Sequence, residues 1–136
     1  MEVRLADCAG FCFGVKRAVD TVYEQLKNGK TIYTYGPIVH NEEVVRELSE
    51  KGVRVLENKE ELKHLKAGEN IPTVIIRAHG VAKEIYDIME ANGLECIDAT
   101  CPFVKKIHRI VEQKSTEGYH VIVVGDPKHP EVEGIV

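Results

Sequence analysis

A cysteine between two glycines is the first stretch of this sequence that could do chemistry. Cys12 lies between Gly10 and Gly14, where an apolar segment ends and a helical pattern begins. Glycine lets a bulky ligand or another backbone approach the thiol closely. Lys16, Arg17 and the free N–H groups of the first helical turn make the surroundings electropositive. Such a cysteine serves as a metal ligand, a nucleophile or a small core residue, and its own surroundings leave all three open.

Three histidines, a second cysteine and a glutamate also follow predicted strands. Ligands bind beyond the carboxyl ends of the strands in parallel α/β sheets, so we expect these side chains to share one edge with Cys12. A single histidine at a strand end is more often a helix cap or a solvated loop residue than a ligand. Several such groups on one edge instead indicate a binding site. The residues are His40, His79, Cys101, His129 and Glu131.

The other histidines and cysteines have different predicted roles. His64, His108 and His120 lie in or beside helix and strand bodies, so we expect them to be structural or solvated. Cys96 falls inside a predicted strand, where a buried, inert thiol is expected. Cys8 lies four residues before Cys12 and receives no role.

The spacing of the cysteines limits the kind of metal site. No two of them are separated by two residues, which disfavours a zinc ribbon or a ferredoxin-like ligand run. Separated cysteines with histidines fit an iron–sulfur site gathered from distant loops, or a thiol-dependent catalyst. Histidines with helix N-termini and basic side chains fit a phosphate or diphosphate ligand.

Alternating strands and helices must position these residues, and they predict an α/β fold with a mostly parallel sheet. Apolar and β-branched runs bounded by turn residues mark the strands, and apolar positions at helical spacing mark the helices. Cys101 and Pro102 are predicted as the N-cap and first residue of a helix. Predicted strands cover residues 3–6, 31–35, 53–56, 73–76, 94–97 and 120–124; predicted helices cover 15–26, 42–51, 58–65, 82–91 and 102–114, and a further helix would start within 125–136.

The overall composition is that of an ordinary globular protein. With 136 residues, 43% hydrophobic and 29% charged, the chain suits one domain with a substantial core. A formal net charge of −4 argues against a nucleic-acid binder. No apolar stretch approaches the ~20 residues of a membrane span and no signal peptide opens the chain, so we expect a cytoplasmic protein without a membrane partner. Cysteines there are free, metal-bound or catalytic rather than paired.

Taken together, the motifs resemble the N-terminal half of the LytB/IspH family, the 4-hydroxy-3-methylbut-2-enyl diphosphate reductases of non-mevalonate isoprenoid biosynthesis. They occur in the family's order along nearly the whole chain. The matching stretches are Gly10-Phe11-Cys12 with Gly14-Val15, Val39-His40-Asn41, Ala78-His79-Gly80-Val81, Asp98-Ala99-Thr100-Cys101-Pro102 and His129-Pro130-Glu131-Val132-Glu133-Gly134.

The resemblance implies a [4Fe–4S] cluster held by three cysteines, with one iron open to the substrate's hydroxyl group. Cys12 and Cys101 match two of these ligands. By the same resemblance, Glu131 is the acid that supplies protons, and His40, His79 and His129 contact the diphosphate of the substrate. The implied reaction is a reductive dehydroxylation to isopentenyl and dimethylallyl diphosphate, with electrons from ferredoxin or flavodoxin.

Family members are about twice as long and have three similar α/β lobes. We therefore expect residues 1–13 to form an N-terminal strand and the start of the cluster loop, residues 14–100 the first lobe, and residues 101–136 the beginning of a second lobe. The third cysteine ligand is expected beyond Val136, so we expect the 136-residue chain alone to hold a cluster poorly and to turn over slowly or not at all.

Two other functions fit the same residues. One is a stand-alone diphosphate- or metal-binding module that uses Cys12 and Cys101 without redox turnover. The other is a thiol hydrolase with Cys12 as the nucleophile and a histidine as the base. Loss of diphosphate binding in His79→Ala would favour the first, and labelling of Cys12 that is insensitive to iron chelators would favour the second.

Overall fold

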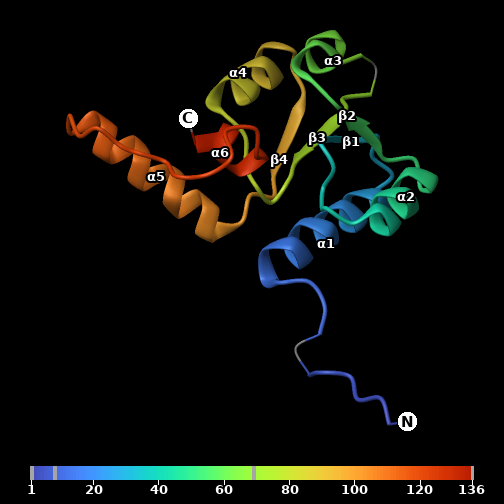
Figure 1. Ribbon diagram of the computed structural model, residues 1–136. Coiled ribbons are helices and arrows are strands. Elements are labelled where there is room, and N and C mark those ends of the chain that lie inside the picture. Colours follow the sequence, from blue (N-terminus) through green and yellow to red (C-terminus); the bar gives the residue numbers. More distant parts are fainter. Residues whose placement is uncertain (1, 8, 69, 136) are drawn as a thin grey trace.

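A parallel β-sheet lies at the centre of this computed structural model, which describes residues 2–7, 9–68 and 70–135 (Figure 1). Within these residues the sheet has four strands, and all three pairings between neighbours are parallel. The predicted α/β class with a parallel sheet is therefore confirmed. In spatial order the strands are β2 (Arg54–Leu56), β1 (Ile32–Tyr35), β3 (Thr73–Ile76) and β4 (Glu95–Asp98).

The winding of the sheet changes direction between β1 and β3. From β1 the chain crosses to β2 on one side, whereas from β3 it crosses to β4 on the other side. In sheets of this kind a crevice opens at the carboxyl ends of the two strands where the direction changes. The loops that leave β1 and β3 border this position, and they carry His40 and His79.

Helices cover both faces of the sheet (Figure 1). β3 is buried on both faces, because Ile75 packs in the cluster formed with the first two helices while Val74 and Ile76 pack in the cluster formed with the next two. This double burial explains the uninterrupted apolar run of the strand. The first pair is α1 (Phe13–Lys27) and α2 (Glu42–Glu50), and the second pair is α3 (Lys59–His64) and α4 (Lys83–Ala91).

Side-chain caps fix the starts of two helices. The Asn41 side chain accepts a hydrogen bond of 3.0 Å from the Val44 N–H, which begins α2. Asn58 likewise accepts one of 3.0 Å from the Glu61 N–H, which begins α3. These bonds satisfy N–H groups that have no partner within a helix.

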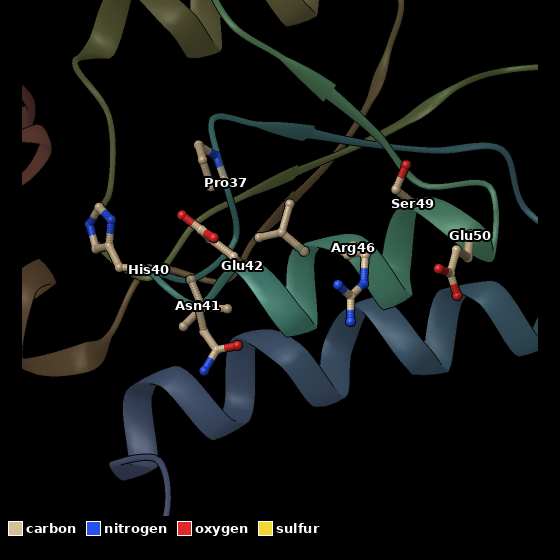
Figure 2. A pocket seen from close by; sticks show the side chains of 9 residues that line it. Pro37, His40, Asn41, Glu42, Arg46, Ser49 and Glu50 are labelled. Atoms are coloured by element: carbon tan, nitrogen blue, oxygen red, sulfur yellow. The ribbon is translucent and has the colours of Figure 1, made fainter.

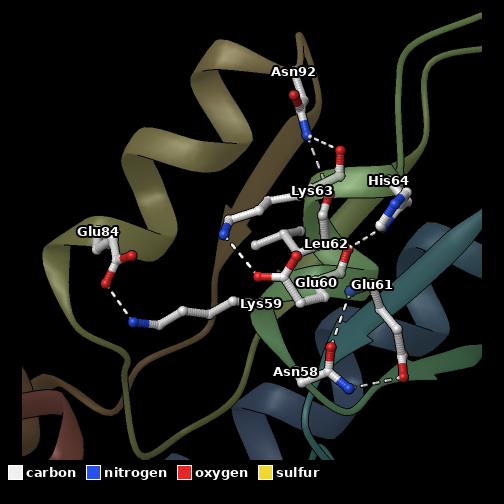
Figure 3. Close-up of polar contacts among 9 residues, drawn as sticks. All are labelled: Asn58, Lys59, Glu60, Glu61, Leu62, Lys63, His64, Glu84 and Asn92. Carbon is white, nitrogen blue, oxygen red and sulfur yellow. Dashed lines mark hydrogen bonds and ion pairs between the residues drawn. The ribbon is translucent and has the colours of Figure 1, made fainter.

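Polar contacts tie the short helix α3 to α4 (Figure 3). Lys59 forms an ion pair with Glu84 at the start of α4. At the other end, the Asn92 amide donates hydrogen bonds of 3.1 Å to the carbonyls of Leu62 and Lys63. A six-residue helix is marginal by itself, so these contacts and the buried Leu62 hold it in place.

The last two helices lie outside these layers. α5 (Pro102–Thr116) starts at its N-cap Cys101 with Pro102 in the first turn, as predicted, and projects away from the sheet (Figure 1). Within the described residues, α5 contains no buried side chain. The chain then returns to α6 (Pro130–Ile135), which packs against α5.

Two predicted strands are wrong. Residues 3–6 and 120–124 are irregular, and their apolar side chains are exposed, with Leu5 at 87% and Ile122 at 85%. A strand requires a hydrogen-bonded neighbour, and neither segment reaches the sheet edges formed by β2 and β4. An apolar run shows only that a segment could form a strand. It does not show whether a neighbouring strand is present to pair with it.

The prediction that Cys96 is buried is also wrong. Cys96 is exposed because it lies on β4, an edge strand of the sheet. Its thiol is nevertheless partly desolvated, and this desolvation, with the charge of Asp98, raises its pKa to about 11. The thiol therefore stays protonated near neutral pH, as expected of an unreactive cysteine. Among the described helices, none has the length and apolarity that a membrane crossing requires.

Two isoleucines test the position of the core. Ile75 is fully buried in β3, whereas Ile122 is 85% exposed. We expect Ile75→Ala to lower the free energy of unfolding by about 2–5 kcal/mol, because it leaves a cavity between β3 and the helices α1 and α2. Ile122→Ala should change it by less than about 0.5 kcal/mol. Urea unfolding followed by circular dichroism measures both, and similar losses would contradict this core.

Candidate functional site

Three histidines from distant parts of the chain meet at the carboxyl edge of the sheet. The ring centroids of His40 and His79 are 4.9 Å apart, those of His79 and His129 are 5.8 Å apart, and those of His40 and His129 are 6.4 Å apart. These three residues are called the histidine cluster below. The prediction that strand-end residues converge is thus confirmed for all three.

Different local structures deliver the three rings. His40 ends the loop after β1, directly before the α2 cap. His79 follows β3 and precedes Gly80, whose positive φ of 74° allows a tight turn in which its N–H donates to the Arg77 carbonyl at 3.1 Å. His129 directly precedes α6 rather than following a strand, so the prediction of its position is right in space but wrong in local structure.

Burial makes His79 the least basic member of the cluster. Desolvation, followed by the charges of His40, Arg77 and His129, lowers the pKa of His79 from its ordinary value of 6.5 to about 4. Its Nδ1 atom is buried, and no hydrogen-bond partner for it lies within the described structure. His79 is therefore neutral at pH 7, and an anion placed among the rings would favour its protonation.

Glu131 lies in the first turn of α6, beside the cluster. Its backbone N–H donates to the Nδ1 atom of His129 at 3.3 Å. Because Nδ1 accepts this bond, a neutral His129 carries its proton on Nε2 and can donate from that atom. The Glu131 side chain is half-buried, and its charge acts on the neighbouring His108 ring.

The two predicted ligand cysteines cap two helices that approach one another. Cys12 is the exposed N-cap of α1, and Cys101 is the half-buried N-cap of α5. Gly14, two residues after Cys12, packs so closely on Cys101 that an added Cβ would lie 2.6 Å from the Cys101 Sγ atom. Neither thiol caps its helix by a side-chain hydrogen bond, so both are free for another partner.

A backbone bond connects the cysteine loop with the histidine cluster. The Cys101 N–H donates to the Ala78 carbonyl at 2.9 Å, and Ala78 directly precedes His79. His79 and Cys101 therefore lie on loops that follow the neighbouring strands β3 and β4, whereas Cys12 follows an irregular segment and His129 lies in the loop before α6. Among the residues that the structure describes, no group of three or more His, Cys, Asp or Glu side chains is arranged to hold a metal ion.

His108 contributes to the site in a way that the sequence did not reveal. Its Cε1 atom lies where Gly80 and Gly134 leave room, 3.0 and 3.3 Å from the positions that added Cβ atoms would take. Burial lowers the pKa of His108, so the ring is a neutral packing group between α5, α6 and the His79 loop. The predicted structural role of His108 is correct. Gly80 and Gly134 leave the space in which its ring packs. His64 and His120 are exposed.

A groove of about 630 Å³ runs along α2 from the histidine cluster (Figure 2). Figure 2 shows His40 at one end of the groove and Ser49 and Glu50 at the other, with Arg46 between them. Of the cluster, only His40 lines this groove. The hollow is thus a neighbour of the converging side chains rather than the place where they meet.

Comparison with known proteins identifies close relatives. The family model described as "LytB protein" matches residues 3–136. A 4-hydroxy-3-methylbut-2-enyl diphosphate reductase from Caldanaerobacter subterraneus is 51% identical over 99% of this chain, which covers 46% of the relative. The reductase of that name from Geobacter sp. is 49% identical over 100% of this chain and 46% of its own length.

Solved structures agree with the sequence comparison. A structure of (E)-4-hydroxy-3-methyl-but-2-enyl diphosphate reductase, described as the terminal enzyme of the non-mevalonate pathway, superposes with a TM-score of 0.80 at 46% identity, covering 96% of this chain and 44% of that one. The Plasmodium falciparum E-1-hydroxy-2-methyl-but-2-enyl-4-diphosphate reductase gives 0.84 at 37% identity, with 95% and 39% covered. The chain spans about half the length of the relatives it matches.

The low basicity of His79 predicts a pH effect on stability. His79 has a pKa of about 4 in the folded chain and about 6.5 when unfolded, so the unfolded state takes up a proton first as the pH falls. Stability from this residue should be complete above pH 6.5 and decline between about 6.5 and 4. NMR titration of the His79 ring checks the pKa; a midpoint near 6.5 would contradict this burial. In His79→Gln the decline should be smaller.

The contact of Gly14 with Cys101 gives a steric prediction. In Gly14→Ala the new methyl group must displace the Cys101 side chain. Overpacking of this kind costs about 1–3 kcal/mol, which exceeds the up to ~1 kcal/mol that Ala gains over Gly in a helix. Gly68→Ala is the control, since its added Cβ meets nothing within 4 Å. Urea unfolding should show a net loss for Gly14→Ala alone; a gain in stability would refute the contact.

Proposed function

Because the chain belongs to the LytB protein family, we propose that it is the N-terminal part of an enzyme that reductively removes the hydroxyl group of 4-hydroxy-3-methylbut-2-enyl diphosphate. The products are isopentenyl and dimethylallyl diphosphate. The observation that carries this proposal is the histidine cluster, whose three rings come from separate elements and meet beside the two cysteine-capped helices.

The histidine cluster is proposed to bind the diphosphate group. Imidazole N–H groups are donors for phosphate oxygens, and an anion beside the buried His79 ring would make that ring easier to protonate. His79, with a pKa of about 4 when free, would be protonated or act as a neutral donor in the complex. The N–H of His129 Nε2 is available because Nδ1 accepts the bond from Glu131.

Cys12 and Cys101 are proposed as two of the ligands of a [4Fe–4S] cluster. The fit is that of a partial site: the sulfur atoms of Cys12 and Cys101 lie at the N-caps of two neighbouring helices, and neither makes a side-chain capping hydrogen bond. Gly14 leaves the room that the Cys101 side chain occupies. When bound, such a cluster supplies single electrons and a Lewis-acidic iron. The third ligand is proposed to come from a part of the enzyme other than the described residues.

Glu131 is proposed as the acid that delivers protons to the departing hydroxyl group. Glu131 is the second residue of α6, two positions after His129, and is half-buried. A positioned carboxylic acid contributes about 10²–10⁴-fold to a proton-transfer step. We further propose residues 14–100 as a first lobe, with residues 101–136 beginning a second, in a cytoplasmic enzyme that takes electrons from ferredoxin or flavodoxin.

A chimera tests the proposal in a complete enzyme. This chain would replace the matching part of the Caldanaerobacter reductase, with which it is 51% identical. After anaerobic reconstitution, the chimera should convert the hydroxylated diphosphate with an artificial reductant. Glu131→Gln should lower kcat by about 10²–10⁴-fold and keep the iron content.

The ligand cysteines supply the matched controls. Cys12→Ser and Cys101→Ser should each lower the iron bound per chimera, whereas Cys96→Ser should not, because Cys96 lies within the edge strand β4 rather than at a helix N-cap. Normal iron content in both ligand variants would overturn the proposal. A chimera that binds diphosphate but has no iron and no turnover would instead support an anion-binding module.

A further inference from the structure

We propose that Arg17 is a positioning residue that sets the spacing between the two turns that carry Cys12 and Cys101. The inference rests on the proposed function in one respect: the two thiols are taken as ligands of the same cluster. We do not propose that Arg17 contacts the substrate or the cluster. It acts through the backbone of the turn before α5.

A hydrogen bond between distant parts of the chain carries the proposal. The Arg17 Nη2 atom donates to the Thr100 carbonyl at 2.5 Å, across 83 positions of sequence. Arg17 lies in α1, whose N-cap is Cys12, and Thr100 directly precedes Cys101. The bond therefore joins the element that starts at one thiol to the residue next to the other.

The turn that receives this bond is fixed from its other sides as well. The Thr100 N–H donates to Asp98 Oδ1 at 2.8 Å, and Asp98 Oδ2 pairs with Lys105 at 2.5 Å. The Cys101 N–H is held by the Ala78 carbonyl at 2.9 Å. These bonds anchor the turn to β4, α5 and the β3 loop, and Arg17 adds the anchor to α1.

An arginine that is half-buried at this position lowers the stability of the fold unless its charge makes a compensating contact. Its Nε atom is buried, and within the described structure it has no hydrogen-bond partner. Burial of part of a charged side chain without full pairing is unfavourable. A charged donor to a carbonyl, however, is a short and strong bond that fixes geometry. Lys16, the adjacent residue, instead pairs with Asp20 at the exposed surface.

Two properties of α1 make this bond relevant to the thiols. Gly14 packs directly on Cys101, so a small slide of α1 would move one cysteine turn against the other. On the α1 side this contact is made by backbone alone, because Gly14 has no side chain to interlock with Cys101. The Arg17 bond, one helical turn further along, supplies this lock.

Three variants test the proposal. Arg17→Met removes the donor but keeps the length of the side chain, and Arg17→Lys keeps one donor on a flexible stem. Lys16→Met removes a neighbouring exposed charge and is the matched control. In the metal-free 136-residue chain, amide hydrogen exchange at Thr100 and Cys101 should become about tenfold faster or more in Arg17→Met, be intermediate in Arg17→Lys, and stay within about twofold in Lys16→Met.

A second readout uses the reconstituted chimera. Loss of iron to a chelator should be about tenfold faster or more in Arg17→Met than in the parent, with partial rescue by Arg17→Lys. Two results in Arg17→Met would overturn the positioning role. One is unchanged amide hydrogen exchange at Thr100 and Cys101, and the other is an unchanged rate of iron loss together with a lowered Tm. If Arg17→Met does not fold, Arg17→Lys decides by the same two measurements. A parent chimera that never binds iron contradicts the proposed function, whereas the exchange result still shows whether Arg17 holds the turn.

Discussion

Parallel pairing of β3 between β1 and β4 is the constraint on which the site depends. It aligns the carboxyl ends of three strands, so the loops bearing His40, His79 and Cys101 leave the sheet at one edge. The bond from the Cys101 N–H to the Ala78 carbonyl joins two of these loops directly. The winding direction changes between β1 and β3, and the loops that carry His40 and His79 leave the sheet on either side of this point. Residues far apart in sequence thus become neighbours through backbone geometry alone.

The electrostatics of this edge suit a ligand that brings its own negative charge. Burial first, and then the charges of His40, Arg77 and His129, lower the pKa of His79, so that this ring is neutral in the free protein near pH 7. A diphosphate offsets the repulsion, so binding and protonation become coupled. Side chains that are always positively charged, such as arginine, could also bind a diphosphate, but they would repel one another in the free protein.

The sequence was sufficient where local rules decide the structure. The strand β3 and the N-cap Cys101 both follow from patterns a few residues long. Convergence of His40 and His79 also followed, because parallel strands order their ends in a known way, whereas His129 joins them without the strand that was predicted before it.

Long-range pairing was what the sequence could not supply. The apolar runs at 3–6 and 120–124 look like strands, but neither meets a partner. Cys96 was expected to be buried and is exposed, because an edge strand has the same local pattern as an inner one. The packing of His108 against Gly80 and Gly134 depends on where α5 and α6 lie, which no short pattern encodes.

If the three histidines form one anion site, diphosphate binding must be coupled to protonation of His79. The His79 ring would be titrated by NMR in the metal-free chain, with and without inorganic diphosphate. We expect diphosphate to raise the pKa of His79 above its free value of about 4 and to change the ring resonances of His40 and His129 in the same experiment. A His79 pKa that does not change at diphosphate concentrations that perturb the other two rings would contradict a single shared site.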